Sequence, residues 1–250
     1  GAKIVTITPE YSPPATKSDY WIPIRPATDT ALFLGITRWL MDNDKYDADF
    51  VKRFTDFPLL VRVDTLERLS AADLFPNYEP GLAPDGPSFA QQQLQPEQYA
   101  TLGDYVVRDA KSNTLVAITR DDVGAAMASK GIDPVLDWSG VVKLADGSEV
   151  EVLTLWAMYK EHLQEYDLDT VADITHAPKH LIERLAEDLA TIKPAALHIG
   201  EGINHWFHAT LANRAQFLPL MLTGNIGRPG AGCYTWAGNY KSALFQGSPQ

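Results

Sequence analysis

The chain contains a single cysteine, Cys233, among its 250 residues. An intrachain disulfide is therefore excluded, and a zinc or iron–sulfur site held only by cysteines cannot be built from this chain alone. No run of about 18 apolar residues appears, so we expect no segment that spans a bilayer. The first residues have neither an initiator Met nor a signal-peptide pattern, and we expect the chain to be an internal piece of a longer polypeptide.

Positive charge is also scarce in this sequence. The 21 Lys and Arg residues are outnumbered by 32 Asp and Glu residues, which gives a formal net charge of −11 at pH 7. Nucleic acids and anionic membrane surfaces would repel such a protein, so we expect neither as a partner. Small anionic ligands remain open, because local backbone dipoles can hold an anion against an unfavourable net charge.

The order of the predicted elements indicates an α/β fold with a layered α/β/α arrangement. A β-branched run at 3–8 predicts a buried strand that ends before Pro9. Apolar residues at helical spacing predict a helix at 28–43, with Thr28 as its N-cap. Further strands and helices are predicted at 20–26, 47–54, 153–166, 178–192 and 194–200 and from about 207 to 222.

The middle of the chain has a different character. It is rich in Pro, Gly and Gln, and it contains two predicted hairpins at 105–118 and 141–153 with a short helix between them. We interpret this region as an insertion with loops and hairpins. The chain then consists of three parts of one incomplete domain: an α/β nucleotide-binding part at 1–62, the insertion at 63–150, and an α/β part with glycine-rich loops at 151–250.

Glycines bracket the last predicted helix. Gly200 and Gly202 follow a predicted strand, at the end where α/β sheets bind ligands, and allow close backbone approach. A second group after the helix consists of Gly224, Gly227, Gly230 and Gly232. Two interpretations are open. The amides of this loop hold an anion with Arg228 in reach, or the glycines form an ordinary helix C-cap and turn.

Five segments together resemble the catalytic alpha subunit of the dimethyl sulfoxide reductase family of molybdopterin oxidoreductases, in the branch of respiratory nitrate reductase and nitrite oxidoreductase. They are Gly1–Tyr11, Asp19–Asp29, Gly200–His208, Leu222–Gly232 and Trp236–Lys241. The order and separation of the segments fit the family, and residues 65–150 match it only loosely. The sequence lacks the family's iron–sulfur motif, its molybdenum ligand and its carboxyl-terminal pterin domain.

The resemblance implies a bis(molybdopterin guanine dinucleotide) molybdenum cofactor and assigns residues to it. Residues near the nucleotide are Thr8, Pro9 and Glu10. Ala27, Thr28 and Asp29 match the motif that holds guanine, and a carboxylate can accept hydrogen bonds from guanine N1–H and its amino group. Family members often have Gly in place of Ala27. The resemblance also assigns a block that faces the pterin and the molybdenum pocket. This block contains Gly202, Asn204 and His205, and the catalytic candidates in it are Asn204 and His205.

Structural interpretations of the same residues stay open. Asp29 can simply favour the helix N-terminus, and His205 and His208 can be structural histidines. Lys241 can be solvated or can contact a phosphate. We expect Trp156 and Met158 to lie in the core, Cys233 to be a packed residue, and the remaining histidines to be structural or on the surface. These histidines are His162, His176, His180 and His198.

The resemblance further implies two-electron oxygen-atom transfer at molybdenum, with nitrite oxidation to nitrate as the expected reaction. Reduction of nitrate, perchlorate, chlorate or selenate is the alternative in the same branch. Expected partners are an iron–sulfur beta subunit and a membrane or haem electron-transfer subunit, with an iron–sulfur cluster in the full-length chain and a small oxyanion as substrate. A cofactor-free electron-transfer scaffold is the alternative of another class. Retention of Asp29, Asn204 and the four glycines disfavours it. The side of the membrane stays open.

Overall fold

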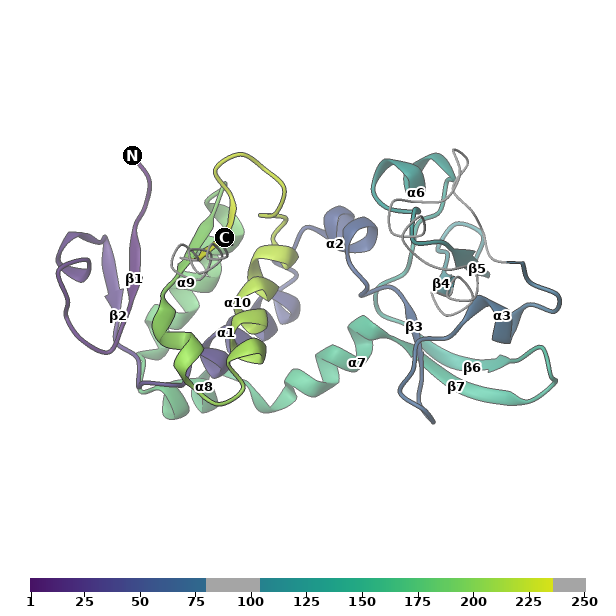
Figure 1. Ribbon diagram of the computed structural model, residues 1–250, viewed down its shortest axis with the longest axis horizontal. Coiled ribbons are helices and arrows are strands. Elements are labelled where there is room, and N and C mark those ends of the chain that lie inside the picture. Colours follow the sequence, from purple (N-terminus) through teal and green to yellow (C-terminus); the bar gives the residue numbers. More distant parts are fainter. Residues whose placement is uncertain (80–103, 236–250) are drawn as a thin grey trace, which may run out of the picture. The chain divides into compact units, whose positions relative to one another are not determined.

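The structure is a computed structural model that describes residues 1–79 and 104–235. The chain divides into two compact units. The first unit combines Gly1–Asp47 with Leu163–Gln250, and the second unit is Ala48–His162. The first unit is therefore built from two segments that are far apart in the sequence, as the colours in Figure 1 show.

The first unit contains parallel strand pairs and helices, which confirms the predicted α/β class. Its elements before the second unit are β1 (Val5–Ile7), η1 (Ala15–Lys17), β2 (Tyr20–Ile22) and α1 (Asp29–Asp42). Those after it are η2 (Leu163–Glu165), α8 (Leu168–Thr175), α9 (Lys179–Thr191), β8 (Ala196–Ile199), η3 (Glu201–His205), α10 (Ala209–Leu222) and β9 (Gly232–Thr235). The predictions of strands at 3–8 and 194–200 and of helices at 28–43 and 178–192 are confirmed. Helix α8 and strand β9 were not predicted.

Helix α1 is the central element of the first unit. Its side chains Leu32, Ile36 and Leu40 are fully buried, and it contacts α8, α9 and α10. Gly35 permits the contact with α8, because a Cβ atom added to it would lie 2.6 Å from Val171 Cγ2. A side chain at this position would push the two helices apart. The predicted helical spacing of apolar residues thus reflects a helix that is packed on several sides.

Each of the two segments of this unit contains one parallel strand pair. β1 pairs with β2, with Thr6 opposite Trp21, and β8 pairs with β9, with Leu197 opposite Cys233. The predicted site segments follow β1 and β8 directly in the sequence. The carboxyl ends of two strands therefore lead into the segments that the sequence singled out.

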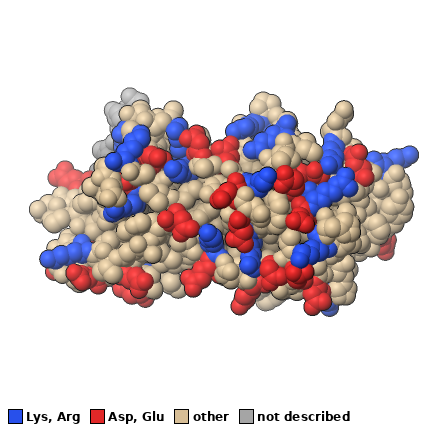
Figure 2. Space-filling view, turned by 180° about the vertical axis from the view of Figure 1, so that it is seen from behind, with Lys and Arg blue, Asp and Glu red and all other residues tan. Residues whose placement is uncertain are grey.

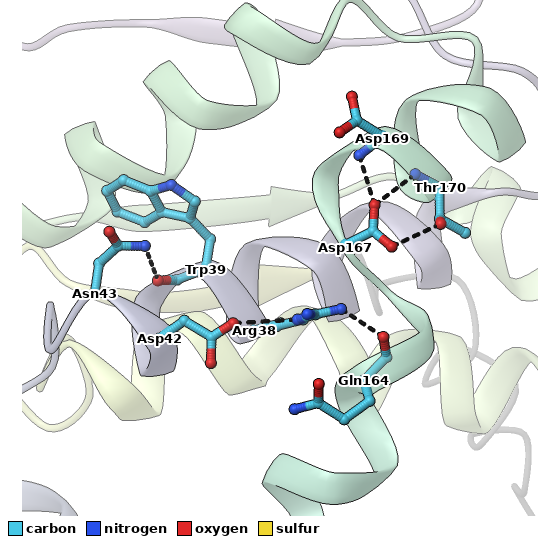
Figure 3. Close-up of polar contacts among 8 residues, drawn as sticks. All are labelled: Arg38, Trp39, Asp42, Asn43, Gln164, Asp167, Asp169 and Thr170. Carbon is cyan, nitrogen blue, oxygen red and sulfur yellow. Dashed lines mark hydrogen bonds and ion pairs between the residues drawn. The ribbon is translucent and has the colours of Figure 1, made fainter.

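Arg38 connects α1 to the segment where the chain returns to the first unit (Figure 3). Its Nη1 donates to the Gln164 carbonyl at 2.5 Å, and its Nε donates to Asp42 Oδ2 at 3.1 Å. Helix α8 begins just beyond. The Asp167 side chain accepts hydrogen bonds from the Asp169 and Thr170 N–H groups, both at 2.9 Å, and so caps the helix.

The second unit is mostly antiparallel. Its strands form a three-stranded sheet in the order β3-β7-β6 and the hairpin β4-β5. Their bounds are β3 (Leu60–Arg62), β4 (Tyr105–Arg108), β5 (Leu115–Ile118), β6 (Ser139–Lys143) and β7 (Glu149–Thr154). Its helices are α2 (Ala48–Phe54), α3 (Ala71–Leu74), α6 (Ala125–Ser129) and α7 (Leu155–His162). Both predicted hairpins and the short helix between them are confirmed.

The compact units do not begin and end where the predicted insertion 63–150 does, since α2, β3 and α7 all belong to the second unit. Two backbone hydrogen bonds hold α7 there: Leu155 N–H donates to Leu59 O at 2.8 Å, and Trp156 N–H donates to Phe57 O at 2.9 Å. The Phe57 and Trp156 rings meet edge to face. Trp156 is buried, as expected, and Met158 is half-buried.

Charged side chains of both signs are interspersed on the face shown in Figure 2. No helix within residues 1–79 and 104–235 is long and apolar enough to cross a membrane.

Candidate functional site

The segment after β1 is the first predicted part of the site. Thr8 extends the pairing of β1 with β2, since its N–H donates to the Ile22 carbonyl at 3.3 Å. The Thr8 carbonyl accepts a hydrogen bond from Trp21 Nε1 at 2.9 Å. Pro9 and Glu10, which follow, are exposed. The backbone is thus fixed up to Thr8, and the next two residues are open to a ligand.

The start of α1 carries the predicted guanine motif. Ala27 has φ +68°, in the left-handed region where a Cβ atom is strained and glycine is favoured. The Gly that the resemblance implies at this position would adopt this conformation without strain. Thr28 occupies the N-cap position, but its hydroxyl donates to the Arg25 carbonyl at 2.6 Å instead of accepting from the helix. The prediction of Thr28 as N-cap is therefore correct in position, but its side chain does not cap the helix.

Asp29 is the first residue of α1, and its carboxylate is only partly solvated. Partial burial raises the pKa of the Asp29 carboxyl above its usual value, and a hydrogen bond from its own backbone N–H offsets part of this increase. No Lys, Arg or His side chain of the described ranges forms an ion pair with it. A partly buried carboxylate without a cationic partner is an acceptor that can take donors from a ligand.

The segment after β8 forms the short helix η3, which holds Gly202, Asn204 and His205. Gly200 and Gly202 face open space, since a Cβ atom added to either would have no neighbour within 4 Å. His205 is exposed. Asn204 is exposed too, but its Oδ1 accepts a hydrogen bond from Asn213 Nδ2 at 2.8 Å. This segment therefore presents polar side chains and accessible backbone together.

Two aromatic side chains follow η3. Trp206 is 50% exposed and Phe207 is 89% exposed. The Phe207 ring lies 4.0 Å from the His208 ring, measured between centroids, and His208 has φ +60° at the N-cap position of α10. His208 thus forms a structural corner between η3 and α10, in line with the structural interpretation of this residue.

The glycine-rich loop after α10 is held by its own hydrogen bonds. Gly224, Gly227, Gly230 and Gly232 all have positive φ. Gly224 N–H and Asn225 N–H donate to carbonyls at the end of α10, and Gly232 N–H donates to Ala195 O. Arg228 pairs with Asp47 at 3.4 Å. Because these N–H groups and Arg228 already have partners in the protein, we prefer the interpretation of the loop as a C-cap and turn to its interpretation as an anion-binding loop.

Asn225 is a residue of this loop that the sequence did not reveal. It is fully buried, and its Oδ1 accepts a hydrogen bond from Ala195 N–H at 2.9 Å, while its Nδ2 donates to Thr223 Oγ1 at 2.8 Å. It therefore connects the end of α10 to the residue before β8. The sequence contains one indication of this role: Asn225 is a polar residue between Gly224 and the apolar Ile226 in the segment Leu222–Gly232.

All the predicted site residues within the described ranges belong to the first unit. No hydrogen bond or ion pair within those ranges joins the side chains of Glu10, Asp29 and His205 to one another. Residues 1–79 and 104–235 also contain no cluster of His, Cys, Asp and Glu that could hold a metal ion. The segment Trp236–Lys241, including Lys241, lies outside the described residues.

Cys233 and His198 lie on the strands β9 and β8. Cys233 is half-buried, and burial raises the pKa of its thiol. The His198 ring stacks on the Tyr234 ring with centroids 5.2 Å apart. Both side chains therefore contribute to packing around this strand pair, as expected from the sequence.

Comparisons with known proteins identify the family to which the chain is similar. The chain is 33% identical over 252 residues to the respiratory nitrate reductase subunit alpha of Haloferax mediterranei, covering 99% of this chain and 24% of that protein. It is 30% identical over 256 residues to the perchlorate reductase subunit alpha of Dechloromonas aromatica, covering 99% of this chain and 27% of that protein. The dimethylsulfide dehydrogenase subunit alpha of Rhodovulum sulfidophilum is 26% identical over 249 residues, covering 98% of this chain and 24% of that protein.

The chain thus spans about a quarter of the length of these relatives. The family described as Molybdopterin oxidoreductase matches residues 1–245. Since this match extends over nearly the whole chain, the chain belongs to the molybdopterin oxidoreductase family, as its motifs predicted.

Proposed function

We propose that this chain forms one side of the cofactor site in an enzyme that transfers an oxygen atom between water and a small oxyanion. Family membership implies a molybdenum–molybdopterin cofactor. The observation that carries the proposal is the state of Asp29, a partly buried carboxylate that no cationic side chain of the described residues pairs with. Such a group costs free energy unless a ligand supplies donors to it.

The residues around Asp29 fit the guanine nucleotide form of the cofactor. The left-handed Ala27 turns the chain just before the helix, and Thr28 and Asp29 follow at its N-terminus. Guanine offers two adjacent N–H donors, and a carboxylate accepts both in one plane. In the proposed arrangement Asp29 binds the base, while Thr8, Pro9 and Glu10 lie near the rest of the nucleotide.

The second contact is proposed at η3, where Gly202, Asn204 and His205 face the pterin and the substrate. The open space at Gly202 supports close approach of a large ring system to the backbone. When bound, bis(molybdopterin guanine dinucleotide) molybdenum supplies the two-electron redox step and the oxygen-atom exchange. In this proposal Asn204 donates a hydrogen bond to an anionic oxygen, and the imidazole of His205, which is exposed, accepts a proton.

The proposed reaction is the oxidation of nitrite to nitrate. Nitrite and water give nitrate, two protons and two electrons, and the electrons leave to a partner electron carrier. The similarity to a nitrate reductase alpha subunit supports this substrate pair, because nitrate reduction is the reverse of nitrite oxidation. Reduction of perchlorate is the second candidate, and the 30% identity to a perchlorate reductase alpha subunit favours it.

Partner subunits are part of the proposal. Two relatives with 30% identity or more are described as alpha subunits, which is consistent with a multi-subunit enzyme. We propose an iron–sulfur beta subunit and a membrane or haem subunit as the route for electrons. An iron–sulfur cluster in the full-length chain would have its ligands outside the present residues, because the chain has one cysteine.

The test uses the full-length protein purified with its partner subunits. Molybdenum is measured by elemental analysis, and GMP is measured after acid hydrolysis of the cofactor. Nitrite oxidation is assayed with ferricyanide, and nitrate and perchlorate reduction are assayed with a reduced viologen. We expect molybdenum, GMP and nitrite oxidation together.

Faster turnover of perchlorate than of nitrite or nitrate would instead establish the second candidate. A folded protein without molybdenum or pterin would contradict the proposal and would support the cofactor-free scaffold.

A further inference from the structure

The side-chain amide of Asn213 identifies which end of Asn204 faces the site. Asn213 lies in the second turn of α10, and its Nδ2 donates to Ala209 O at 2.8 Å. A backbone carbonyl can only accept, so the atom of Asn213 on that side must be the nitrogen. The same Nδ2 donates to the Asn204 side chain at 2.8 Å.

This pair of contacts determines the orientation of both amides. One NH₂ group has two hydrogens, and Asn213 uses one on Ala209 and one on Asn204. The Asn204 atom that receives the second hydrogen must therefore be its oxygen. The Asn204 NH₂ group then points away from Asn213, and it donates no hydrogen bond within residues 1–79 and 104–235.

We propose that Asn213 is a positioning residue that holds Asn204 as a hydrogen-bond donor to an acceptor oxygen, either of the oxyanion substrate or of the cofactor. This inference rests on the proposed function. The adjacent Gly202 leaves open space on η3, and Asn204 is exposed, so a ligand oxygen can reach the NH₂ group. Without Asn213, the amide would rotate freely and present its oxygen to an anion for part of the time, which is repulsive.

The first test is Asn213→Asp in the full-length enzyme with its partner subunits. A carboxylate has no hydrogen to donate, so Asn204 is expected to turn its NH₂ group toward residue 213 and its oxygen toward the site. Loss of a hydrogen bond to a charged group predicts a rise of roughly tenfold to a hundredfold in KM for nitrate. Thr210→Ala, an exposed change on the first turn of the same helix, is the control and should keep the wild-type KM.

A second variant distinguishes loss of the outward hydrogen-bond donor from local misfolding. Asn204→Asp keeps an oxygen opposite Asn213 Nδ2, so the local hydrogen bonds remain, but it removes the outward donor. It is expected to raise KM as much as Asn213→Asp does. In an Asn204→Ala background, Asn213→Asp should have no additional effect on KM, whereas a purely structural role of Asn213 would add its own effect.

Measurements on the molybdenum show whether the substrate or the cofactor supplies the acceptor oxygen. Molybdenum content and the Mo(V) EPR spectrum are recorded for each variant with and without nitrate. If the substrate supplies the oxygen, the content is unchanged and the nitrate-dependent change of the spectrum is lost. If the cofactor supplies it, the content falls or the nitrate-free spectrum changes.

A wild-type KM, molybdenum content and EPR response in both Asn213→Asp and Asn204→Asp would overturn the assignment. A wild-type enzyme that itself lacks molybdenum would overturn the proposed function first, so the two failures are distinguishable.

Discussion

Asn225 Oδ1 accepts a hydrogen bond from the backbone N–H of Ala195 at 2.9 Å, across a sequence separation of 30 residues. Asn225 is fully buried, and its Nδ2 donates to Thr223 Oγ1. The contact connects the loop after α10 to the segment that leads into β8 and η3. Together with the pairing of β8 and β9, this buried amide outside the proposed site therefore helps to fix the site's position.

We expect Asn225→Ala to destabilise the first unit by about 2–4 kcal/mol, because it leaves buried groups without partners and creates a cavity. Hydrogen exchange of the Ala195 amide in the full-length protein should become faster. Unchanged protection of this amide would show that Asn225 does not hold the segment before β8.

Two glycines of the same loop form a matched pair for mutation. Gly224 and Gly227 have similar positive φ values of +67° and +74°. A Cβ atom at Gly224 would lie 2.6 Å from Asp47 Oδ2, whereas at Gly227 it would have no neighbour within 4 Å. Both Ala variants pay the backbone strain of about 1–2 kcal/mol, and only Gly224→Ala adds a clash. We expect a clearly lower thermal midpoint for Gly224→Ala, and equal midpoints would contradict this reasoning.

Asp29→Asn tests the guanine contact and the cost of burying the carboxylate. The variant loses one of two acceptor oxygens and the charge, so we expect cofactor affinity to fall roughly tenfold or more. GMP and molybdenum content of the purified enzyme measure this loss. Normal occupancy would show that Asp29 does not hold the nucleotide.

The same variant makes a prediction for the pH dependence of the cofactor-free protein. The folded-state pKa of Asp29 is raised, so the folded state binds more protons than the unfolded state above the ordinary value of 3.8. The free energy of unfolding then decreases as pH rises through this window. Asp29→Asn should be more stable than the wild type at pH 7, and the difference should shrink toward pH 4. A difference that does not vary with pH would argue against the raised pKa.

Ala27→Gly should stabilise the folded protein without disturbing the site. Ala27 has φ +68°, and removing its Cβ relieves about 1 kcal/mol of strain, less the extra entropy of glycine in the unfolded chain. We expect a small rise in thermal midpoint with unchanged molybdenum content. A lower midpoint would indicate that Ala27 does not have this conformation in solution.

In the second unit, Asp109 holds the turn of the β4-β5 hairpin. The Ser112 hydroxyl and N–H donate to its Oδ2 at 2.6 and 2.8 Å, and Asp133 N–H donates to its Oδ1 at 2.8 Å. These hydrogen bonds, led by that of the Ser112 hydroxyl, lower the pKa of the Asp109 carboxyl well below its usual range. Its stabilising effect is therefore present above pH about 4 and lost as pH falls further.

Asp109→Ala should cost about 2–3 kcal/mol at pH 7, since three donors lose their acceptor. Denaturant unfolding at pH 7 and at pH 3 checks this: the difference from wild type should be smaller at pH 3. Asp146→Ala is a matched control in the other hairpin, because Asp146 accepts from Ser148 alone on an exposed turn and should cost less.

The sequence predicted those elements whose signal is local. The apolar spacing of Leu32, Ile36 and Leu40 indicated α1, and the turn at Asp146 and Gly147 indicated a hairpin. Strand β9 was not predicted, because its four residues Gly232–Thr235 have no distinct alternation and are fixed by pairing with β8. The bounds of the second unit depend on contacts such as that of Phe57 with Trp156, which bring together residues about a hundred positions apart.

In the candidate site, too, local sequence patterns predicted some residues, whereas others depend on contacts between distant parts of the chain. Family motifs indicated Asp29, Asn204 and Gly202, but no local pattern could reveal that Asn213 sets the orientation of Asn204. The buried role of Asn225 was hidden for a similar reason. Each depends on hydrogen bonds whose partners are separated in the sequence and become neighbours only in the folded chain.

The two junctions of the second unit are both tied into the first unit. At the exit, Asp47 N–H donates to the Leu222 carbonyl at 2.7 Å, and at the return, Arg38 holds the Gln164 carbonyl. Changes of length or sequence between these points therefore need not be transmitted to β1, η3 or the glycine loop. The second unit is therefore expected to be replaceable as a module, with the fold of the first unit retained.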